Sequence, residues 1–489
     1  MEQARAAGPL ALHAFLAGMP KGGDLHNHLG GAVYAETWLR DAAADHVCID
    51  PKALDFVRRG SGLATAPCAS PAVDASTLTQ NQPLYDQLID AFSMRSFEPV
   101  TGESGHDHFF ATFGLFSGLA ETHKPEWVDE VAERAAAQNE QYLELMDTPG
   151  AAFALIAQAK PVAPGTGYAA WRQQLLDAGL SQQALAVRQQ MDRFEQTRRA
   201  TERCGTAEPA PACNVEVRYL YQVLRNMPPP AVFAQIVLGF EVAAADLASS
   251  HPHYVGLNLV QPEDAEYSMG DYTLHMQMIA ALRPFYPHVP ITLHAGELAP
   301  GLVPPEGLRS HIRQAIAIAG AQRIGHGVDL MYEDQPYELL KTMADHHILV
   351  EINLTSNDVI LGIKGKDHPL PLYRKYDVPV ALSTDDEGVS RIDLTHEYVT
   401  AAETFGLTYP ELKEMVRNSI EYSFLPGDSL WRDHDYRHPQ PACATSLTGD
   451  HDPGTACAAV LAASPKAQQQ WRLEERFHRF ERAQGPDLH

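Results

Sequence analysis

The sequence predicts an α/β fold, a TIM-type (β/α)8 barrel with helical insertions, and three observations support that prediction. Short apolar runs rich in β-branched residues alternate with longer amphipathic stretches, which is typical of βα units that form a parallel sheet. Eight such runs can be placed, the number of strands in a barrel of this type. The chain of 489 residues is longer than an ordinary domain, but a barrel with insertions can absorb that length in one unit. A doubly wound open sheet is the alternative fold.

The predicted strands follow one another at intervals long enough for a helix between successive strands. They span residues 23–29, 141–146, 214–222, 254–260, 290–294, 323–326, 349–353 and 380–384. Apolar residues at three- and four-residue steps predict amphipathic helices between them, among them 126–139, 229–247, 308–319 and 337–346.

Several segments exceed a minimal barrel. The barrel itself is expected over residues 19–425, with insertions at about 48–123 and 149–211 whose helical patterns indicate caps or lids. An N-terminal segment covers residues 1–18. Residues 426–489 are expected to form a loop and a helix, at 466–484, packed on the barrel.

Composition excludes two classes of function. The formal net charge is −25 and no Lys- or Arg-rich stripe is visible, whereas a protein that binds nucleic acid needs a basic face to neutralise phosphates. No apolar run appears long enough to cross a bilayer, so we expect no membrane span. A neutral or cationic small molecule is the expected partner.

The six cysteines form three pairs that are close in sequence: Cys48 with Cys68, Cys204 with Cys213, and Cys443 with Cys457. Local pairs in loop-like stretches are typical of disulfides, which persist in oxidising compartments. We therefore expect a periplasmic or secreted protein, although the first residues show no basic segment or clear cleavage site of a signal peptide. Six free thiols in a cytoplasmic enzyme are the alternative.

Polar residues cluster where four of the predicted strands end. They are His26 and His28 after the first strand, His294 and Glu297 after the fifth, His326 after the sixth, and Asp385 and Asp386 after the eighth. The carboxyl ends of barrel strands meet on one face, where active sites form. Three imidazoles and one carboxylate suit a zinc ion with an open position for water, whose pKa the metal lowers to near neutrality. Glu297 and His326 could then manage protons.

The same residues, read in order, carry a family resemblance. The segments Met19–Leu29 (MPKGGDLHNHL), His294–Glu297 (HAGE), Gly325–Gly327 (GHG), Thr355–Asn357 (TSN) and Ser383–Asp386 (STDD) resemble the adenosine deaminase family. The resemblance spans roughly residues 19–425. The residues 94–97 (MRSF) and 417–425 (RNSIEYSFL) are similar to its extended, growth-factor-related branch, which is often extracytoplasmic.

This resemblance implies a zinc-dependent hydrolase that converts adenosine to inosine plus ammonia and deaminates deoxyadenosine in the same way. One zinc ion would be held by His26, His28, His294 and Asp385. Glu297 would protonate purine N1 as hydroxide attacks C6, His326 would orient the hydroxide, and Asp386 would bind N7. Gly296, Gln261 and Gly30 would complete the substrate site.

Two positions depart from the family pattern. The family usually has glycine at Gln261, whose backbone N–H would reach purine N3, so the Gln261 side chain must turn away or add a contact. Many members carry an acidic residue that contacts ribose at the position of Gly30. Base recognition is thus better supported than sugar recognition, and adenine, a modified nucleoside or AMP remain alternative substrates.

Other polar and aromatic residues are interpreted as structural. The histidines of the first insertion, and the phenylalanines at helical steps within it, are expected to pack rather than bind substrate: His106, His108, His123, Phe109, Phe110, Phe113 and Phe116. The family does place apolar groups there.

Two other functions stay open. A different reaction of the wider hydrolase superfamily, such as ring opening or ester hydrolysis, is possible, but two-metal relatives bridge their ions with a modified lysine on strand four and residues 254–260 contain none. The chain could also be a nucleoside-binding or growth-factor-like protein with little turnover, because fold alone does not determine function. The oligomeric state, monomer or homodimer, is undetermined.

Overall fold

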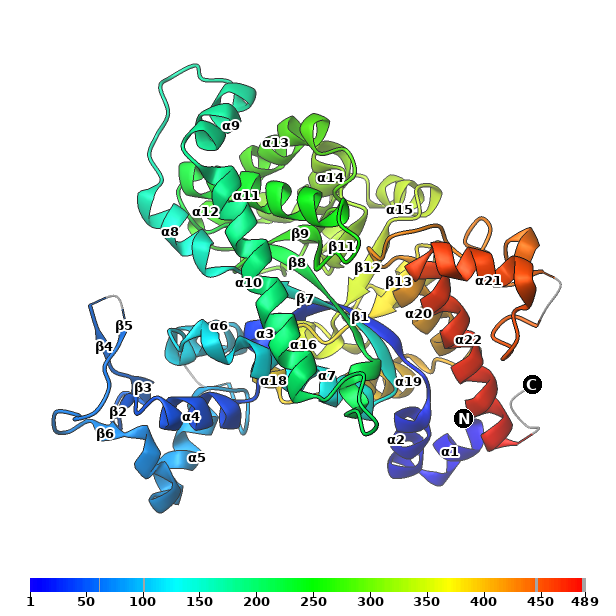
Figure 1. The fold of residues 1–489 in the computed structure, drawn as a ribbon, viewed down its shortest axis with the longest axis horizontal. Coiled ribbons are helices and arrows are strands. Elements are labelled where there is room, and N and C mark those ends of the chain that lie inside the picture. The colour runs from blue at the N-terminus through cyan, green and yellow to red at the C-terminus, as the bar shows by residue number, and fades with distance from the viewer. Residues whose placement is uncertain (61, 100–101, 445–446, 486–489) are drawn as a thin grey trace.

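The computed structural model describes residues 1–60, 62–99, 102–444 and 447–485, and eight parallel strands form its centre (Figure 1). All eight predicted strands are present, with ends shifted by no more than a few residues. They are β1 (Gly22–His28), β7 (Glu140–Asp147), β8 (Glu216–Leu224), β9 (Tyr254–Val260), β10 (Thr292–Ala295), β11 (Arg323–His326), β12 (Leu349–Ile352) and β13 (Val380–Leu382).

Two four-stranded sheets, β1-β7-β8-β9 and β10-β11-β12-β13, join to close the barrel. One junction is the parallel bridge between Leu257 and Ile291, and the other is the bridge between Asn27 and Asp385. At the second junction the His28 N–H donates to the Asp385 carbonyl (3.0 Å) and the Asp385 N–H donates to the His26 carbonyl (2.9 Å). This closure confirms the TIM barrel, and it puts the ends of the first and last strands side by side.

Helices cover the outside of the barrel and follow the predicted pattern. They include α7 (Lys124–Ala137), α11 (Pro229–Leu247), α13 (Tyr272–Leu282), α15 (Pro336–Asp345), α16 (Leu354–Leu361), α19 (Leu394–Phe405) and α20 (Tyr409–Glu421). The helix expected at 308–319 is instead a short helix, α14 (His311–Gln314), that continues as a π-helical turn over Ala315–Ala319.

Helix α11 corrects the expectation that no apolar run is long enough to cross a bilayer. Its 19 residues meet the length and hydropathy of a membrane span. Most of the helix is buried within the protein, where it packs against β8, β9 and α10 (Leu180–Thr201). Its apolar character is therefore used in the core.

The first insertion contains β-structure that its helical pattern did not predict. After α4 (Ala35–Ala44), the strands β2 (Cys48–Asp50), β3 (Asp55–Phe56) and β6 (Val73–Asp74) pair antiparallel, and β4 (Arg58–Arg59) pairs with β5 (Gly62–Leu63). Strands of two or three residues are too short for a two-residue period to show. These strands lie away from the barrel, at the lower left of Figure 1.

The rest of the first insertion is helical, and α6 (Gly105–Phe116) matters most for the site. Ser104 and Asp107 form a capping box that fixes its N-terminus. Helix α6 packs on α16, and a Cβ on Gly105 would overlap the carbonyl of Val359, so only glycine allows this approach. The second insertion consists of α8 (Gly150–Gln158), α9 (Tyr168–Asp177) and α10.

Disulfides join Cys48 to Cys68, Cys204 to Cys213 and Cys443 to Cys457, as the cysteine spacing predicted. The last pair holds a helix that was not expected, α21 (Gly454–Ala463), beside the predicted final helix α22 (Pro465–Gln484). The N-terminal helix α2 (Pro9–Gly18) packs against α22, where the rings of Phe15 and Phe480 meet edge-on with centroids 5.2 Å apart.

Candidate active site

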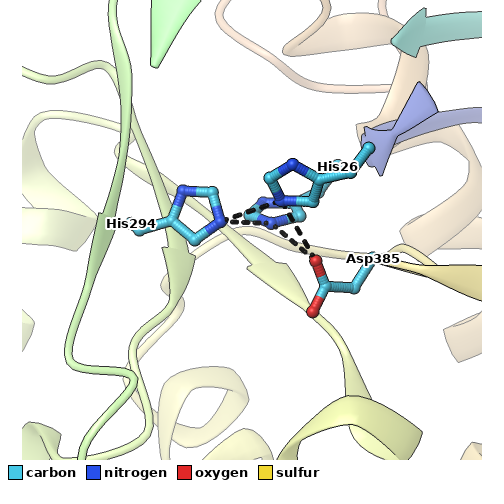
Figure 2. A group of neighbouring side chains, drawn as sticks. His26, His294 and Asp385 are labelled. Carbon is cyan, nitrogen blue, oxygen red and sulfur yellow. Dashed lines mark hydrogen bonds and ion pairs between the residues drawn. The ribbon is translucent and has the colours of Figure 1, made fainter. Parts of the chain in front are cut away.

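The four residues expected to bind metal converge at the carboxyl ends of three strands (Figure 2). The Nε2 atom of His294 lies 3.1 Å from Nε2 of His26 and 3.1 Å from Nε2 of His28. Oδ1 of Asp385 lies 3.4 Å and 3.3 Å from the Nε2 atoms of His26 and His28. Four ligand atoms therefore face one point.

In each of the three imidazoles the outer nitrogen, Nδ1, which does not face the other ligand atoms, has its own hydrogen-bond acceptor. Nδ1 of His26 donates to Glu351 (2.6 Å), Nδ1 of His28 to the Gln222 side-chain oxygen (2.9 Å), and Nδ1 of His294 to the Asn258 side-chain oxygen (3.0 Å). With the proton on Nδ1, a neutral histidine directs the Nε2 lone pair inward. This is the usual arrangement of metal-binding histidines.

The separations between these atoms fit a metal ion. Zinc holds nitrogen and oxygen ligands at about 2.0–2.2 Å, which places tetrahedral neighbours about 3.3–3.6 Å apart. The two distances to Asp385 lie in that range, and the two between imidazoles, at 3.1 Å, lie just below it. Burial, together with His26 and His28, lowers the pKa of His294 well below its usual range. Although burial opposes charge at His26, its contacts with Asp385 and Glu351 raise the pKa of that imidazole to about 10, so these two carboxylates favour a positive charge beside them, which a bound cation would supply in place of the proton.

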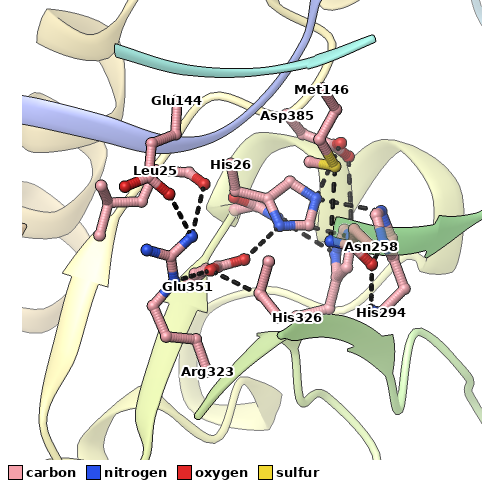
Figure 3. Close-up of polar contacts among 12 residues, drawn as sticks. Leu25, His26, Glu144, Met146, Asn258, His294, Arg323, His326, Glu351 and Asp385 are labelled. Atoms are coloured by element: carbon pink, nitrogen blue, oxygen red, sulfur yellow. Dashed lines mark hydrogen bonds and ion pairs between the residues drawn. The ribbon is translucent and has the colours of Figure 1, made fainter. Parts of the chain in front are cut away.

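A buried network behind His26 holds its acceptor in place (Figure 3). Glu351 accepts from Arg323 Nε (2.7 Å) and from the Thr292 hydroxyl (2.8 Å) in addition to His26. Arg323 bonds a second carboxylate, Glu144, at 2.6 Å. Despite burial, Arg323 and the hydrogen bonds lower the pKa of Glu351 to about 2, so the acceptor of the His26 proton is ionised.

Three site residues adopt a left-handed backbone that non-glycine residues rarely adopt. The φ angles of Gln261, His326 and Asp385 are 86°, 68° and 61°. Such conformations cost about 1–3 kcal/mol each and persist only where the surroundings enforce them. At Asp385 the Ser356 hydroxyl, 2.6 Å from Oδ2, adds to that constraint and turns Oδ1 toward the histidines.

Glu297 lies beside the four candidate metal-binding residues, and its carboxyl group is close to other carboxylates. The loop that carries it is held by Glu263, whose carboxylate accepts from the N–H groups of Gly296 (3.1 Å) and Glu297 (2.8 Å). Burial, together with the charges of Asp385 and Glu263, raises the pKa of Glu297 well above its usual range. Glu297 is thus disposed to carry a proton.

His326 completes this side of the site. Its Nε2 lies 3.7 Å from Oε1 of Glu297 and 3.9 Å from Oδ2 of Asp385, close enough to share a small reacting group with both. Burial lowers the pKa of this imidazole to about 3, so it is neutral.

Asp386 lines the same cavity from the other side. Burial raises its pKa well above the usual range, with a further contribution from the neighbouring Asp385, against the opposing effect of His28. Its Oδ1 is buried without a hydrogen-bond partner, which marks a group that awaits a ligand. A Cβ on Gly31 would overlap the Asp386 carboxylate, so glycine is required there.

A cavity of about 290 Å³ opens onto these groups. Three aromatic rings of α6, from Phe109, Phe110 and Phe113, form part of its wall, whereas Phe116 stacks on Trp38 away from it. Polar and small residues form the rest: His28, Gly30, Gly31, Gln222, Gln261, His294, Glu297, Asp385 and Asp386, together with Leu224, Val260 and Pro262. The expectation that these phenylalanines only pack is thus incomplete.

The two departures from the family pattern are both at the cavity. The Gln261 side-chain oxygen accepts from the Asn226 N–H (2.8 Å), so this side chain is tied to the neighbouring loop. A Cβ on Gly30 would meet nothing within 4 Å, which leaves that wall open. Gly296 is not among the residues that line the cavity. It directly precedes Glu297 in the loop after β10 and has a φ of 77°.

Several residues that support the site were not singled out from the sequence. Gln222, Asn258 and Glu351 are polar residues within strands β8, β9 and β12, and each holds one imidazole. A polar side chain within a buried barrel strand is uncommon, and that signal could have identified them. The histidines His106 and His123, interpreted as structural, pair with Asp264 and Asp45 at 3.0 Å.

Comparisons with known proteins agree with this site and fold. Residues 107–432, more than half of the chain, match the family described as adenosine deaminase. An adenosine deaminase from Clostridium perfringens is 36% identical over 135 residues, which are 27% of this chain and 37% of that relative. The matched region thus spans little more than a third of that curated relative.

Two solved structures show the same fold. An amidohydrolase from Burkholderia ambifaria with bound Zn aligns over 85% of this chain and 88% of its own, with a TM-score of 0.55 and 18% identity. The N6-mAMP deaminase of Arabidopsis aligns over 84% of this chain and 96% of its own, with a TM-score of 0.53 and 21% identity. Together with the family match, the barrel identifies this chain as a member of the adenosine deaminase family.

Proposed function

We propose that this chain binds one zinc ion through His26, His28, His294 and Asp385 and hydrolytically removes the 6-amino group of a purine nucleoside. Adenosine would give inosine and ammonia, and deoxyadenosine would give deoxyinosine and ammonia. The observation that carries the proposal is the convergence of three Nε2 atoms and one carboxylate oxygen beside Glu297 at the end of a small cavity. Zinc held there would lower the pKa of water to near neutrality and supply the nucleophile.

The residues around that point divide the remaining work. Glu297, disposed to carry a proton, donates it to purine N1 and so makes C6 electrophilic. His326 lies between Glu297 and Asp385 and orients the attacking oxygen. The raised pKa of Asp386 favours the protonated acid, which donates to purine N7.

The cavity favours an uncharged substrate. Phe109, Phe110 and Phe113 offer aromatic surface for a purine ring, and the open wall at Gly30 leaves room for a sugar. Among the described residues that line the cavity there is no Lys or Arg, whereas a nucleotide phosphate calls for such partners. We therefore rank adenosine and deoxyadenosine above AMP.

A substrate panel tests the proposal. Zinc-loaded protein is incubated with adenosine, deoxyadenosine, adenine, N6-methyladenosine and AMP. The change in purine absorbance is followed, together with the release of ammonia or, from N6-methyladenosine, of methylamine. We expect the highest kcat/KM for the two nucleosides and loss of turnover with a chelator. Faster turnover of adenine or AMP would show that our assignment of the substrate is wrong. If the protein binds these compounds but turns over none of the five, the result would support a nucleoside-binding protein.

We also propose that the protein works outside the cytoplasm, because three disulfides of this kind persist in oxidising compartments. The mass of denatured, unreduced protein isolated from its native host should rise by about two units per bridge on reduction. A mass unchanged by reduction would support the cytoplasmic alternative.

A further inference from the structure

A chain of hydrogen bonds runs from the protein backbone to the outer nitrogen of His326. The Leu370 N–H lies 3.1 Å from Nδ1 of His368, and Nε2 of His368 lies 3.0 Å from Oδ1 of Asn357. Nδ2 of Asn357 in turn lies 3.0 Å from Nδ1 of His326. The three side chains are almost fully buried.

The backbone group sets the direction of every bond in this chain. A peptide N–H can only donate, so Nδ1 of His368 accepts and the proton of this imidazole is on Nε2. Nε2–H then donates to Oδ1 of Asn357, which leaves the Asn357 amide nitrogen facing His326. An amide nitrogen can only donate, so Nδ1 of His326 accepts as well.

The opposite orientation of the Asn357 amide would break the chain. It would place an NH2 group against the Nε2–H of His368, two donors within a buried contact, which costs about 1–3 kcal/mol for each group left unsatisfied. Burial also lowers the pKa of His368 to about 4, in agreement with a neutral ring that carries a single proton.

We propose that His368 and Asn357 are positioning residues that hold His326 as its Nε2–H tautomer, so that the ring presents a proton donor to the reacting oxygen between Glu297 and Asp385. The catalytic consequence rests on the deaminase function proposed above, but the tautomer itself does not. In this tautomer the Nε2 atom of His326 has no lone pair to offer. His326 therefore cannot act as the base that deprotonates water, nor as a ligand to a second cation with Glu297 and Asp385.

Nitrogen NMR of the zinc-loaded protein with 15N-labelled histidine measures the tautomer directly. The His326 signals are identified by their loss in His326→Gln. We expect a protonated Nε2 and an unprotonated Nδ1 in the native protein. A protonated Nδ1 on His326 would overturn the proposal without any variant or assay of turnover.

Two variants connect the tautomer to turnover. Asn357→Asp replaces the donor by a carboxylate, so Nδ1 of His326 becomes the protonated nitrogen. We expect kcat to fall about 10²- to 10⁴-fold, the usual contribution of a positioned proton donor, because a histidine in the wrong tautomer loses that role, while zinc content and KM change by less than about threefold. His368→Leu removes the donor to Asn357 and should lower kcat about 10- to 100-fold.

Matched variants separate this role from general damage. His368→Gln keeps an amide donor for Asn357 and should retain kcat within a few fold of native. Asn418→Asp alters another buried asparagine, whose amide donates to the Val380 carbonyl at 2.8 Å, and should leave the His326 tautomer and kcat unchanged. Native kcat in Asn357→Asp, or equal losses in His368→Gln and His368→Leu, would overturn the positioning role. If native protein deaminates no purine, the proposed function fails while the NMR result still decides the tautomer.

Discussion

Replacing Glu351 by glutamine tests whether the residues behind the histidines set the affinity for metal. Glu351 accepts the Nδ1–H of His26 at 2.6 Å and is ionised, so its charge makes the opposite nitrogen, Nε2, a stronger donor of electrons to a cation. The glutamine side chain keeps the shape and one acceptor but loses the charge.

The size of the effect follows from the contacts of Glu351. Its pKa is lowered from 4.5 to about 2, which corresponds to about 3 kcal/mol of net stabilisation of the carboxylate. Arg323, Thr292 and His26 share this energy, so the contact with His26 accounts for about 1–2 kcal/mol of it. We therefore expect zinc affinity to fall about 10-fold, the lower part of the 10- to 100-fold range usual for such residues.

The assay is competition for zinc between the protein and a fluorescent chelator of known affinity. Glu144→Gln is the matched control: Glu144 is equally buried and bonds the same Arg323 at 2.6 Å, but the carboxylate next to His26 is that of Glu351. Both variants should lose stability to urea, and only Glu351→Gln should lose zinc affinity. An equal loss of affinity in the two variants would show that the effect comes from the buried ion-pair network and not from His26.

Three further outcomes are expected. Glu297→Gln should retain one zinc per chain by elemental analysis and lose about 10²- to 10⁴-fold in kcat, because the amide cannot protonate purine N1; native kcat would remove Glu297 from its proposed role. Chelation should lower the free energy of unfolding by about 4 kcal/mol relative to protein in zinc buffered at about 1,000 times its Kd, measured by urea unfolding; an unchanged midpoint would mean that the folded chain binds no zinc. Burial, with Arg225 nearby, lowers the pKa of His275 from 6.5 to about 4, so the unfolded chain binds the extra proton and stability falls as pH drops from about 6.5 toward 4. His275→Leu should therefore gain about 2 kcal/mol more at pH 5 than at pH 7.5 in urea unfolding, and equal gains at both pH values would contradict the burial argument.

The barrel could be predicted from the sequence because its signal is repeated. Eight apolar runs that alternate with amphipathic stretches agree on one architecture, even where single ends are shifted and two insertions lengthen the intervals. The small antiparallel strands near Cys48 and the π-helical turn at Ala315–Ala319 carry no such repetition. Each of these elements is too short to show a period of its own, so a local pattern does not reveal it.

Part of the candidate site could likewise be predicted from the sequence, and part of it could not. Residues at strand ends, such as His26, His294 and Asp385, could be placed together because a barrel brings those ends to one face. The partners of their outer nitrogens, such as Gln222 and Glu351, lie within strands, and the contacts between them depend on the register between strands. A hydrogen-bond chain such as that through His368 needs coordinates to be seen at all.

The place where the barrel closes has a consequence for how the protein matures. On the ribosome the β1 histidines emerge early, whereas Asp385 emerges only after most of the chain has been made. The ion proposed to bind both ends would therefore complete its ligand set in one of the last steps of biogenesis. It would then join the His28 and Asp385 side chains beside the backbone hydrogen bonds that close the barrel. Amide hydrogen exchange at His28 and Asp385 should respond to zinc more strongly than exchange at Leu257 and Ile291, because no pair of metal ligands spans the bridge between Leu257 and Ile291.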